Sequence, residues 1–166
     1  MSTRGSLIIV KDNKVKLACY LAHDSYPSGE GMEILSFLHE PSNIIQLGSR
    51  LDHYIGDAED LDGDDYEDSE SLLNMILVKD IHYYPYQNFI QDSLFCEWAY
   101  EINFDAQELV VYKGFQHKRW IRGIFPDDQG YYPCKPTGVI EFRDIVNNYN
   151  AVKTAMETIK ENNDDE

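Results

Sequence analysis

The chain has 166 residues and a formal net charge of −16, with 43% hydrophobic and 13% aromatic residues. This length fits one domain, whose core is large enough to fold without a metal or a disulfide. The apolar and aromatic content excludes a disordered chain.

Cysteine usage and hydropathy indicate a cytoplasmic protein. Cys19, Cys96 and Cys134 are odd in number and form no C-x-x-C pair, which suits reduced thiols better than a disulfide framework. No apolar run approaches the roughly 20 residues of a spanning helix, and "SLIIV" before Lys11 is too short for a signal-peptide core. We therefore expect neither a membrane span nor a secretion signal.

The negative charge is concentrated in two segments. Residues 57–70 hold nine acids and no base, and residues 161–166 hold four acids and no base, which leaves about −3 for the rest of the chain. A DNA mimic would instead spread carboxylates over its surface. We expect a single domain over 1–160 with an acidic insertion at 57–70, followed by an acidic disordered tail at 161–166.

The first half of the chain predicts a hairpin and then helices. Residues 5–11 and 15–23 read as two strands joined by a tight turn at Asp12 and Asn13. Because both faces of the second strand are apolar, we expect it to be central in its sheet. Helical spacing of apolar residues follows over 32–38 and 44–55, with a break at Pro41.

The apolar run 72–77 fits a helix or a strand, and Asp68 and Ser69 as N-caps favour a helix. Beyond it, alternation predicts a strand over 95–104 that turns through "DAQE" into a second strand over 109–115. The last expected elements are a loop at 126–137, a short strand at 138–142 and an amphipathic helix over 142–159. The prediction is an α+β fold, an antiparallel sheet built from hairpins with helices packed on it.

The loop "HDSYPSGEG" is the first candidate site, because it follows a buried strand and leads into a helix. A nucleotide or small anion could bind at 24–31 through the helix N-terminus and neighbouring polar groups. Turn chemistry explains the same letters, since Asp, Ser, Pro and Gly shape turns. The candidate ligand-binding residues are His23, Asp24, Ser25, Tyr26, Ser28, Gly29 and Arg4.

A catalytic N-terminus is an alternative. Removal of Met1 would leave Ser2 with a free α-amino group that can act as a general base beside a hydroxyl nucleophile. A strand that begins almost at this residue is similar to the start of the N-terminal nucleophile hydrolases, which implies an amide or peptide hydrolase using Ser2. The similarity covers about 25 residues. Because Ser2 could equally just lead into the strand, a binding role is favoured over an enzyme.

The acidic block provides a candidate partner-binding surface for a protein with a basic surface. Its residues are Asp57, Glu59, Asp60, Asp62, Asp64, Asp65, Glu67 and Asp68. The block does not fit a calcium loop, because Ala58 and Ser69 would stand at the first and last ligand positions. No histidine or cysteine spacing indicates a metal, and we expect no cofactor.

One basic stretch, "KGFQHKRWIRG", interleaves cations with aromatic residues. Lys113, Lys118, Arg119 and Arg122 lie beside Phe115 and Trp120. Such a pattern is typical of single-stranded nucleic-acid sites, but the acidic chain opposes long-range attraction to nucleic acid. We expect these cations to pair with the chain's own carboxylates or with an acidic patch on a partner.

Three stretches, "STRG", "HDSYPSG" and "FCEWAYEINFD" running into "LVVYKGFQ", carry a family resemblance over residues 2–116. The chain resembles a group of small, functionally unassigned proteins of bacteriophages and bacteria that open with Met, a small residue and Thr-Arg-Gly and carry an Asp-x-Tyr-Pro-Ser-Gly turn. The resemblance implies a phage setting and transfers no catalytic residue. The expected function is a cytoplasmic accessory protein that binds, and in an inhibitor-like way blocks, a host or defence protein.

Overall fold

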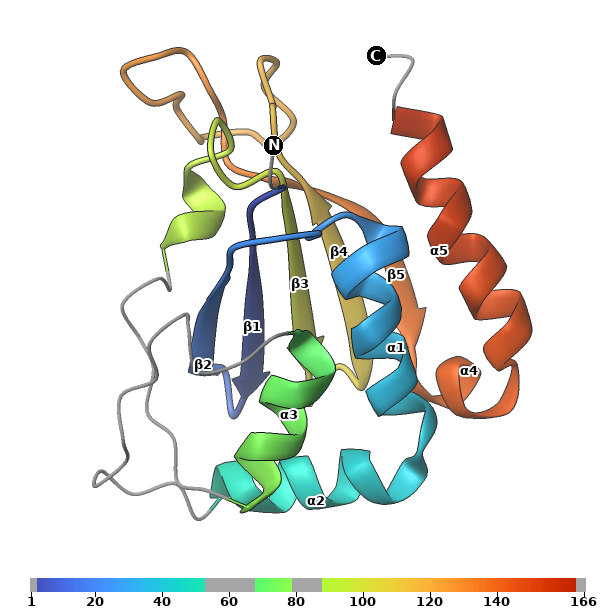
Figure 1. Cartoon of the computed structure of the whole chain (residues 1–166). Helices are drawn as coiled ribbons and strands as arrows, with labels where there is room; N and C mark the ends of the chain where they lie inside the picture. Colours follow the sequence, from blue (N-terminus) through green and yellow to red (C-terminus); the bar gives the residue numbers. More distant parts are fainter. Residues whose placement is uncertain (1–2, 53–67, 79–87, 164–166) are drawn as a thin grey trace.

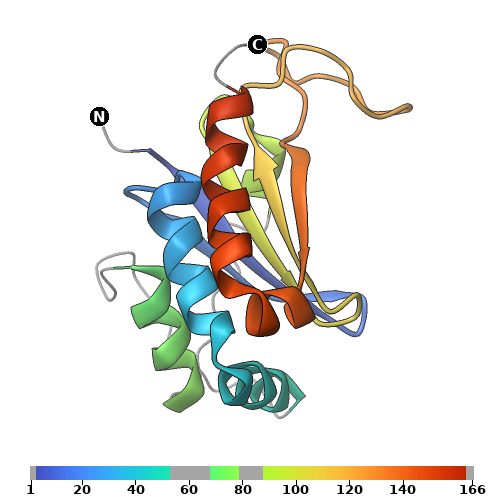
Figure 2. The same cartoon turned by 90° about the vertical axis from the view of Figure 1, so that its right-hand side faces the viewer.

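The computed structural model describes residues 3–52, 68–78 and 88–163, which form a sheet with a layer of helices on one face (Figures 1 and 2). α1, α3 and α5 lie on the same face, and α2 crosses the end of this helical layer. A short 3-10 turn, η2 (Phe89–Gln91), packs on the opposite face through Phe89, whose ring meets that of Tyr20. The arrangement is α+β.

The described residues form a sheet of five strands in the order β2-β1-β3-β4-β5. β1 (Gly5–Lys11) and β2 (Lys14–Leu21) form the predicted antiparallel hairpin, with positive φ at Asp12 and Asn13 in its turn. β3 (Trp98–Asn103) pairs with β4 (Glu108–Lys113), and β4 pairs with β5 (Lys135–Glu141), both antiparallel.

One pair departs from the predicted antiparallel sheet. β1 and β3 run parallel, with Gly5 opposite Trp98 and Val10 opposite Asn103, so the sheet is mixed. β2 already returns the chain to the end at which β1 began, and the connection from β2 to β3, which contains α1 to α3, starts and finishes at that end and sets β3 on the other side of β1. β1 and β3 are parallel because the strand between them in the chain pairs outside them, and a reading of local hairpins cannot supply that position.

The prediction that the second strand is central is wrong. Among the described residues β2 pairs with β1 alone, and it stands at the edge of the sheet that they form. Leu17, Ala18 and Cys19 are nevertheless buried, although their side chains point to opposite faces. Apolar residues on both faces show that both faces are covered, and they do not show how many strands flank the backbone.

The helical segments follow the prediction with two differences. α1 (Met32–His39) is preceded by a π-helical turn, η1 (Pro27–Gly31), and α2 (Pro41–Asp52) begins at the expected proline. α3 (Ser69–Val78) is a helix, and the Asp68 carboxylate accepts the Ser71 N–H at 2.7 Å as its cap. The predicted last helix is two, α4 (Phe142–Asn147) and α5 (Tyr149–Asn163), because Asn148 leaves the helical conformation. β5 also begins three residues earlier than predicted.

The main core lies between the sheet and the helices, and alternate strand residues such as Leu7, Ile9, Tyr100 and Ile102 belong to one buried cluster with Phe37 of α1. A second, small cluster on the opposite face contains Cys96, Ala99 and Cys134, packed against η2. The three cysteines are free thiols and buried, and burial raises the pKa of Cys19. They are therefore core residues in an unreactive form.

Three predictions concern residues outside the described ranges. They are the predictions for Ser2, for residues 57–67 of the acidic block and for residues 164–166 of the tail. In the part of the chain that the structure describes, no helix is both long and apolar enough to cross a membrane. The same part contains no group of three or more His, Cys, Asp or Glu side chains suited to a metal ion.

Candidate functional site

The β2-exit loop, residues 22–31, uses most of its polar groups for internal bonds. Asp24 has a φ of 50°, and its carbonyl oxygen accepts the Glu30 N–H at 2.8 Å. The Tyr26 hydroxyl donates to the Asp24 carboxylate at 3.1 Å, and this bond raises the pKa of Tyr26. A side chain at Gly29 would overlap the Asp24 carbonyl oxygen, so glycine is required there.

Ser25 anchors this loop to the rest of the fold. Its N–H donates to the Thr3 carbonyl at 3.3 Å, and its hydroxyl donates to the Leu21 carbonyl at 3.3 Å. The buried Tyr100 hydroxyl donates to the Ser25 carbonyl at 2.6 Å. Ser25 is fully buried, whereas His23 and Ser28 are exposed. The bonds of Ser25 therefore serve the fold.

Carboxylates occupy the end of the loop that was predicted to bind an anion. Glu30 is 6% exposed, and its carboxylate accepts the Ser69 N–H at 2.7 Å, which docks α3. Glu33 lies in the first turn of α1, and burial together with a hydrogen bond to Glu70 raises the pKa of Glu33 to about 7. Desolvation raises the pKa of Glu30 as well. Negative charge at this position opposes an anionic ligand.

Arg4 does not join the predicted loop site. Its backbone N–H donates to the Glu97 carboxylate at 2.9 Å, and its guanidinium lies 5.6 Å from the centre of the Phe95 ring. The structure therefore divides the predicted ligand residues into an internally bonded loop and an arginine associated with Phe95. The alternative nucleophile Ser2 lies outside the described residues, and its role stays a prediction.

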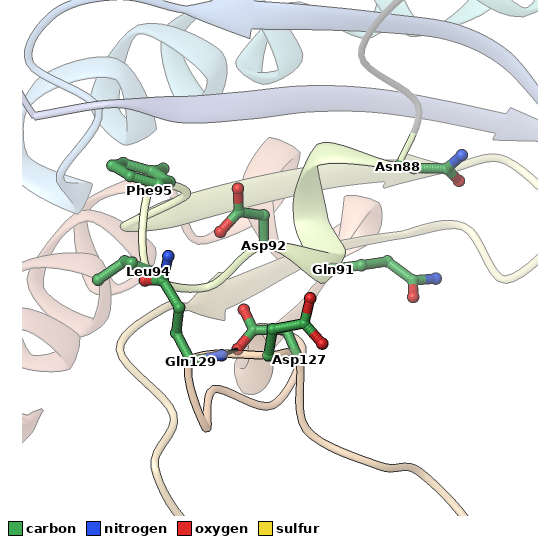
Figure 3. Close-up of a pocket in the computed structure, with 8 residues that line it drawn as sticks. Asn88, Gln91, Asp92, Leu94, Phe95, Asp127 and Gln129 are labelled. Atoms are coloured by element: carbon green, nitrogen blue, oxygen red, sulfur yellow. Dashed lines mark hydrogen bonds between the residues drawn. The ribbon is translucent and has the colours of Figure 1, made fainter.

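Phe95 belongs to a cavity of about 370 Å³ that the sequence did not reveal (Figure 3). One wall is η2 with the turn after it, and the other is the tip of the connection between β4 and β5, at residues 127–129. Figure 3 shows Gln91 and Asp92 on the first wall and Asp127 and Gln129 on the second. The lining consists of Asn88, Gln91, Asp92, Leu94, Phe95, Asp127, Asp128 and Gln129.

Backbone bonds hold the two walls of this cavity together. The Cys134 N–H donates to the Ile90 carbonyl at 2.9 Å, and the Phe115 N–H donates to the Ser93 carbonyl at 2.6 Å. One oxygen of Asp127 accepts the N–H groups of Gln129 and Tyr131, each at 2.9 Å, and so shapes the tip. The cavity is therefore preorganised rather than a gap between loose loops.

The cavity is suited to a cation. It carries three carboxylates and three side-chain amides, with no basic side chain among its lining residues. Within residues 3–52, 68–78 and 88–163, the carboxylates of Asp92 and Asp128 accept no hydrogen bond. A guanidinium or ammonium group could pair with these carboxylates while amide oxygens accept its remaining N–H groups. The Phe95 ring, 45% exposed, adds an apolar side.

Next to the cavity, residues 115–125 form a projecting segment, which we call the arm. It contains Lys118, Arg119 and Arg122 and no acid, and all three are exposed. The Trp120 indole N–H, in the middle of the arm, donates to the Pro133 carbonyl at 2.8 Å and ties the arm to the segment that leads into β5. The Arg119 guanidinium lies 5.8 Å from the centre of the Phe125 ring, which is 77% exposed.

Sequence reasoning found the arm but missed the cavity. Asp92 and Asp127 are far apart in the chain, and each resembles an ordinary turn residue. Only the pairing of η2 with the β4–β5 connection brings them together. Comparison with protein-family models, curated proteins and solved structures gave no match, so the site is interpreted from this chain's own residues.

Proposed function

We propose that this protein acts by binding a protein partner, and that the partner inserts a basic side chain into the cavity. The observation that carries the proposal is the set of three carboxylates, Asp92, Asp127 and Asp128, around one preformed cavity. An arginine of the partner would satisfy Asp92 and Asp128 and gain charge-assisted hydrogen bonds. The net charge of −16 would speed the approach of a basic surface.

Exposed apolar side chains of the cavity and the arm support a protein partner over a small cation. Phe95, Phe115, Ile121 and Phe125 are all more than two-fifths exposed. Aromatic and arginine side chains are enriched at protein interfaces, where they supply most of the binding energy. In the phage setting that the resemblance implies, the partner would be a host or defence protein that this chain inhibits by occupying its basic surface.

In this proposal the acidic block attracts the partner from a distance and does not form the contact. Of the predicted partner-binding residues only Asp68 lies in the described part of the chain, and its carboxylate caps α3. Long-range attraction depends on ionic strength, because charges separated by more than about 8 Å are screened at physiological salt. Deletion of residues 57–67 should therefore slow association at low salt and leave it nearly unchanged at high salt.

The test titrates the protein with a short peptide that contains one arginine between neutral residues. The control peptide carries citrulline in its place, which keeps the shape and removes the charge. Two-dimensional NMR of the side-chain amides of Asn88, Gln91 and Gln129 should show shifts with the arginine peptide only. Equal shifts with both peptides, or none with either, would contradict the proposal.

A pair of matched variants tests whether binding depends on the cavity carboxylates or only on the net charge of the protein. Asp92→Asn with Asp128→Asn removes two charges and leaves Asp127, which shapes the tip, in place. We expect it to weaken arginine-peptide binding about tenfold, or about 1.4 kcal/mol. Asp12→Asn with Asp144→Asn removes the same charge at the other end of the sheet and should leave the affinity unchanged.

A further inference from the structure

The arm and the cavity place opposite charges side by side at one end of the molecule. The arm is part of the long connection between β4 and β5, and the tip of the same connection forms one wall of the cavity (Figure 1). The arm contributes three cations, Lys118, Arg119 and Arg122, and the cavity contributes three carboxylates. The same end of the molecule therefore carries three cations and three carboxylates.

The described part of the fold does not neutralise the cations of the arm. Among the described residues, Lys118, Arg119 and Arg122 make no ion pair with a carboxylate, whereas Arg143 pairs with Glu141 at 2.8 Å. Arg119 lies against the Phe125 ring, a contact that orders a guanidinium while leaving its N–H groups to the outside. The sequence suggested two partners for the basic stretch, the chain's own carboxylates or an acidic patch on a partner, and the first is not found for Lys118, Arg119 and Arg122 among the described residues.

We propose that a second copy of this chain occupies this end of the molecule, and that each copy inserts an arginine of its arm, Arg119 or Arg122, into the cavity of the other. A surface that carries a patch and its complement is self-complementary under a two-fold rotation, which is the geometry of most soluble homodimers. The cavity is then completed by its partner's arm, and the exposed Phe125 and Ile121 are covered at the centre.

The high net charge does not forbid this dimer. The net charge of −16 makes two copies repel each other, but most of this charge lies in residues 57–70 and 161–166. Salt screens the repulsion between charges more than about 8 Å apart. At contact distance the arm and the cavity attract. An acidic partner of another kind would match the arm alone and leave the three carboxylates of the cavity unpaired, so the second copy fits this end of the molecule better.

This inference rests on the proposed function, since it uses the same cavity as a receptor for arginine. Light scattering after size exclusion measures the mass of the intact protein against the 19.3 kDa of one chain. We expect twice that mass at high protein concentration, and a shift toward the single chain on dilution or in high salt. A single-chain mass at every concentration in low and moderate salt would overturn the dimer.

Charge reversal identifies the contacting groups. Arg119→Glu with Arg122→Glu, the arm variant, and Asp92→Lys with Asp128→Lys, the cavity variant, should each be monomeric alone. A mixture of the two should recover the dimer mass, because the reversed charges match again across one half of the interface. Lys14→Glu with Arg143→Glu changes the net charge as much as the arm variant does, at the other end of the sheet, and should stay dimeric.

The outcomes distinguish this inference from the proposed function. A monomer whose cavity binds the arginine peptide and not the citrulline peptide overturns the dimer and leaves the proposed function standing. A dimer that survives both charge reversals places the contact elsewhere and also overturns the inference. Dissociation of the dimer by the arginine peptide, with no effect of the citrulline peptide, supports both. Circular dichroism of each variant confirms that it is folded.

Discussion

The β2-exit loop and the arm with its cavity are both polar connections next to the same end of the sheet, yet they use their residues in opposite ways. In the loop, Asp24, Ser25 and Glu30 form hydrogen bonds with backbone groups of the fold. In the arm and cavity, Asp128, Arg122 and Phe125 are exposed and find few partners among the described residues. A polar loop is therefore informative about function only once its internal bonds have been assigned.

The largest expected effect is a loss of stability caused by a substitution in the β2-exit loop. Gly29→Ala places a methyl group against the Asp24 carbonyl oxygen, which belongs to backbone that is itself bonded to Glu30. We expect it to lower the free energy of unfolding by about 3 kcal/mol, measured by urea denaturation. Ser28→Ala, at an exposed position in the same loop, should change stability by less than about 0.5 kcal/mol. A Gly29→Ala protein as stable as the wild type would contradict the packed-loop interpretation.

A smaller effect is expected at the bond that ties this loop to β3. Tyr100→Phe removes the hydroxyl that donates to the buried Ser25 carbonyl at 2.6 Å and leaves that oxygen unsatisfied. The expected loss is about 2 kcal/mol. The control, Tyr131→Phe, keeps the ring contact with His117 and should be near neutral. If Tyr100→Phe also abolished binding of the arginine peptide, the loop and the cavity would not be the separate regions described above.

The opposite result is expected in the arm. Phe125 is 77% exposed, so Phe125→Ser should leave the free energy of unfolding within about 0.5 kcal/mol of the wild type. The same change should reduce the fraction of dimer, because the ring is buried only when two copies meet. Sedimentation and thermal unfolding on the same sample measure both quantities. A large loss of stability with unchanged association would show that the ring serves the fold, as the loop residues do.

Local patterns predicted the local parts of this fold. Alternation and turn residues identified the hairpins β1–β2 and β3–β4, and the Asp68 cap correctly decided that α3 is a helix. The parallel pairing of β1 with β3 was missed because it depends on where a long connection returns. The edge position of β2 was missed because residues such as Ala18 report coverage of a face, not neighbours in the sheet.

The candidate site was harder to predict for a related reason. His23 and Ser28 lie in a recognisable turn motif, but the residue types that make the motif recognisable are those that shape a turn. Asp92 and Asp128 belong to no motif, and they become a site only when η2 docks on the β4–β5 connection. The basic stretch was visible because its charges are close together in the chain, whereas the carboxylates of the cavity come from two separate segments.

The last and smallest effect uses pH to separate the loop from the cavity. Glu33 has a pKa of about 7 in the folded protein, above the 4.5 of an unperturbed carboxyl, because burial and the bond to Glu70 favour its protonated form. Its contribution to stability is therefore complete below about pH 4.5 and is lost as the pH rises through about 7. Glu30, whose pKa is also raised, acts in the same direction.

Glu33→Gln keeps a hydrogen-bonding side chain without the titration, so its melting temperature should fall less than that of the wild type between pH 5 and about pH 8. At about pH 5 the two proteins should melt together, and at about pH 8 the variant should be the more stable of the two. Equal pH dependence in both proteins would show that Glu33 does not titrate there. Binding of the arginine peptide should be the same in both at either pH, because Glu33 lies among the helices on the face of the sheet opposite η2, which forms one wall of the cavity.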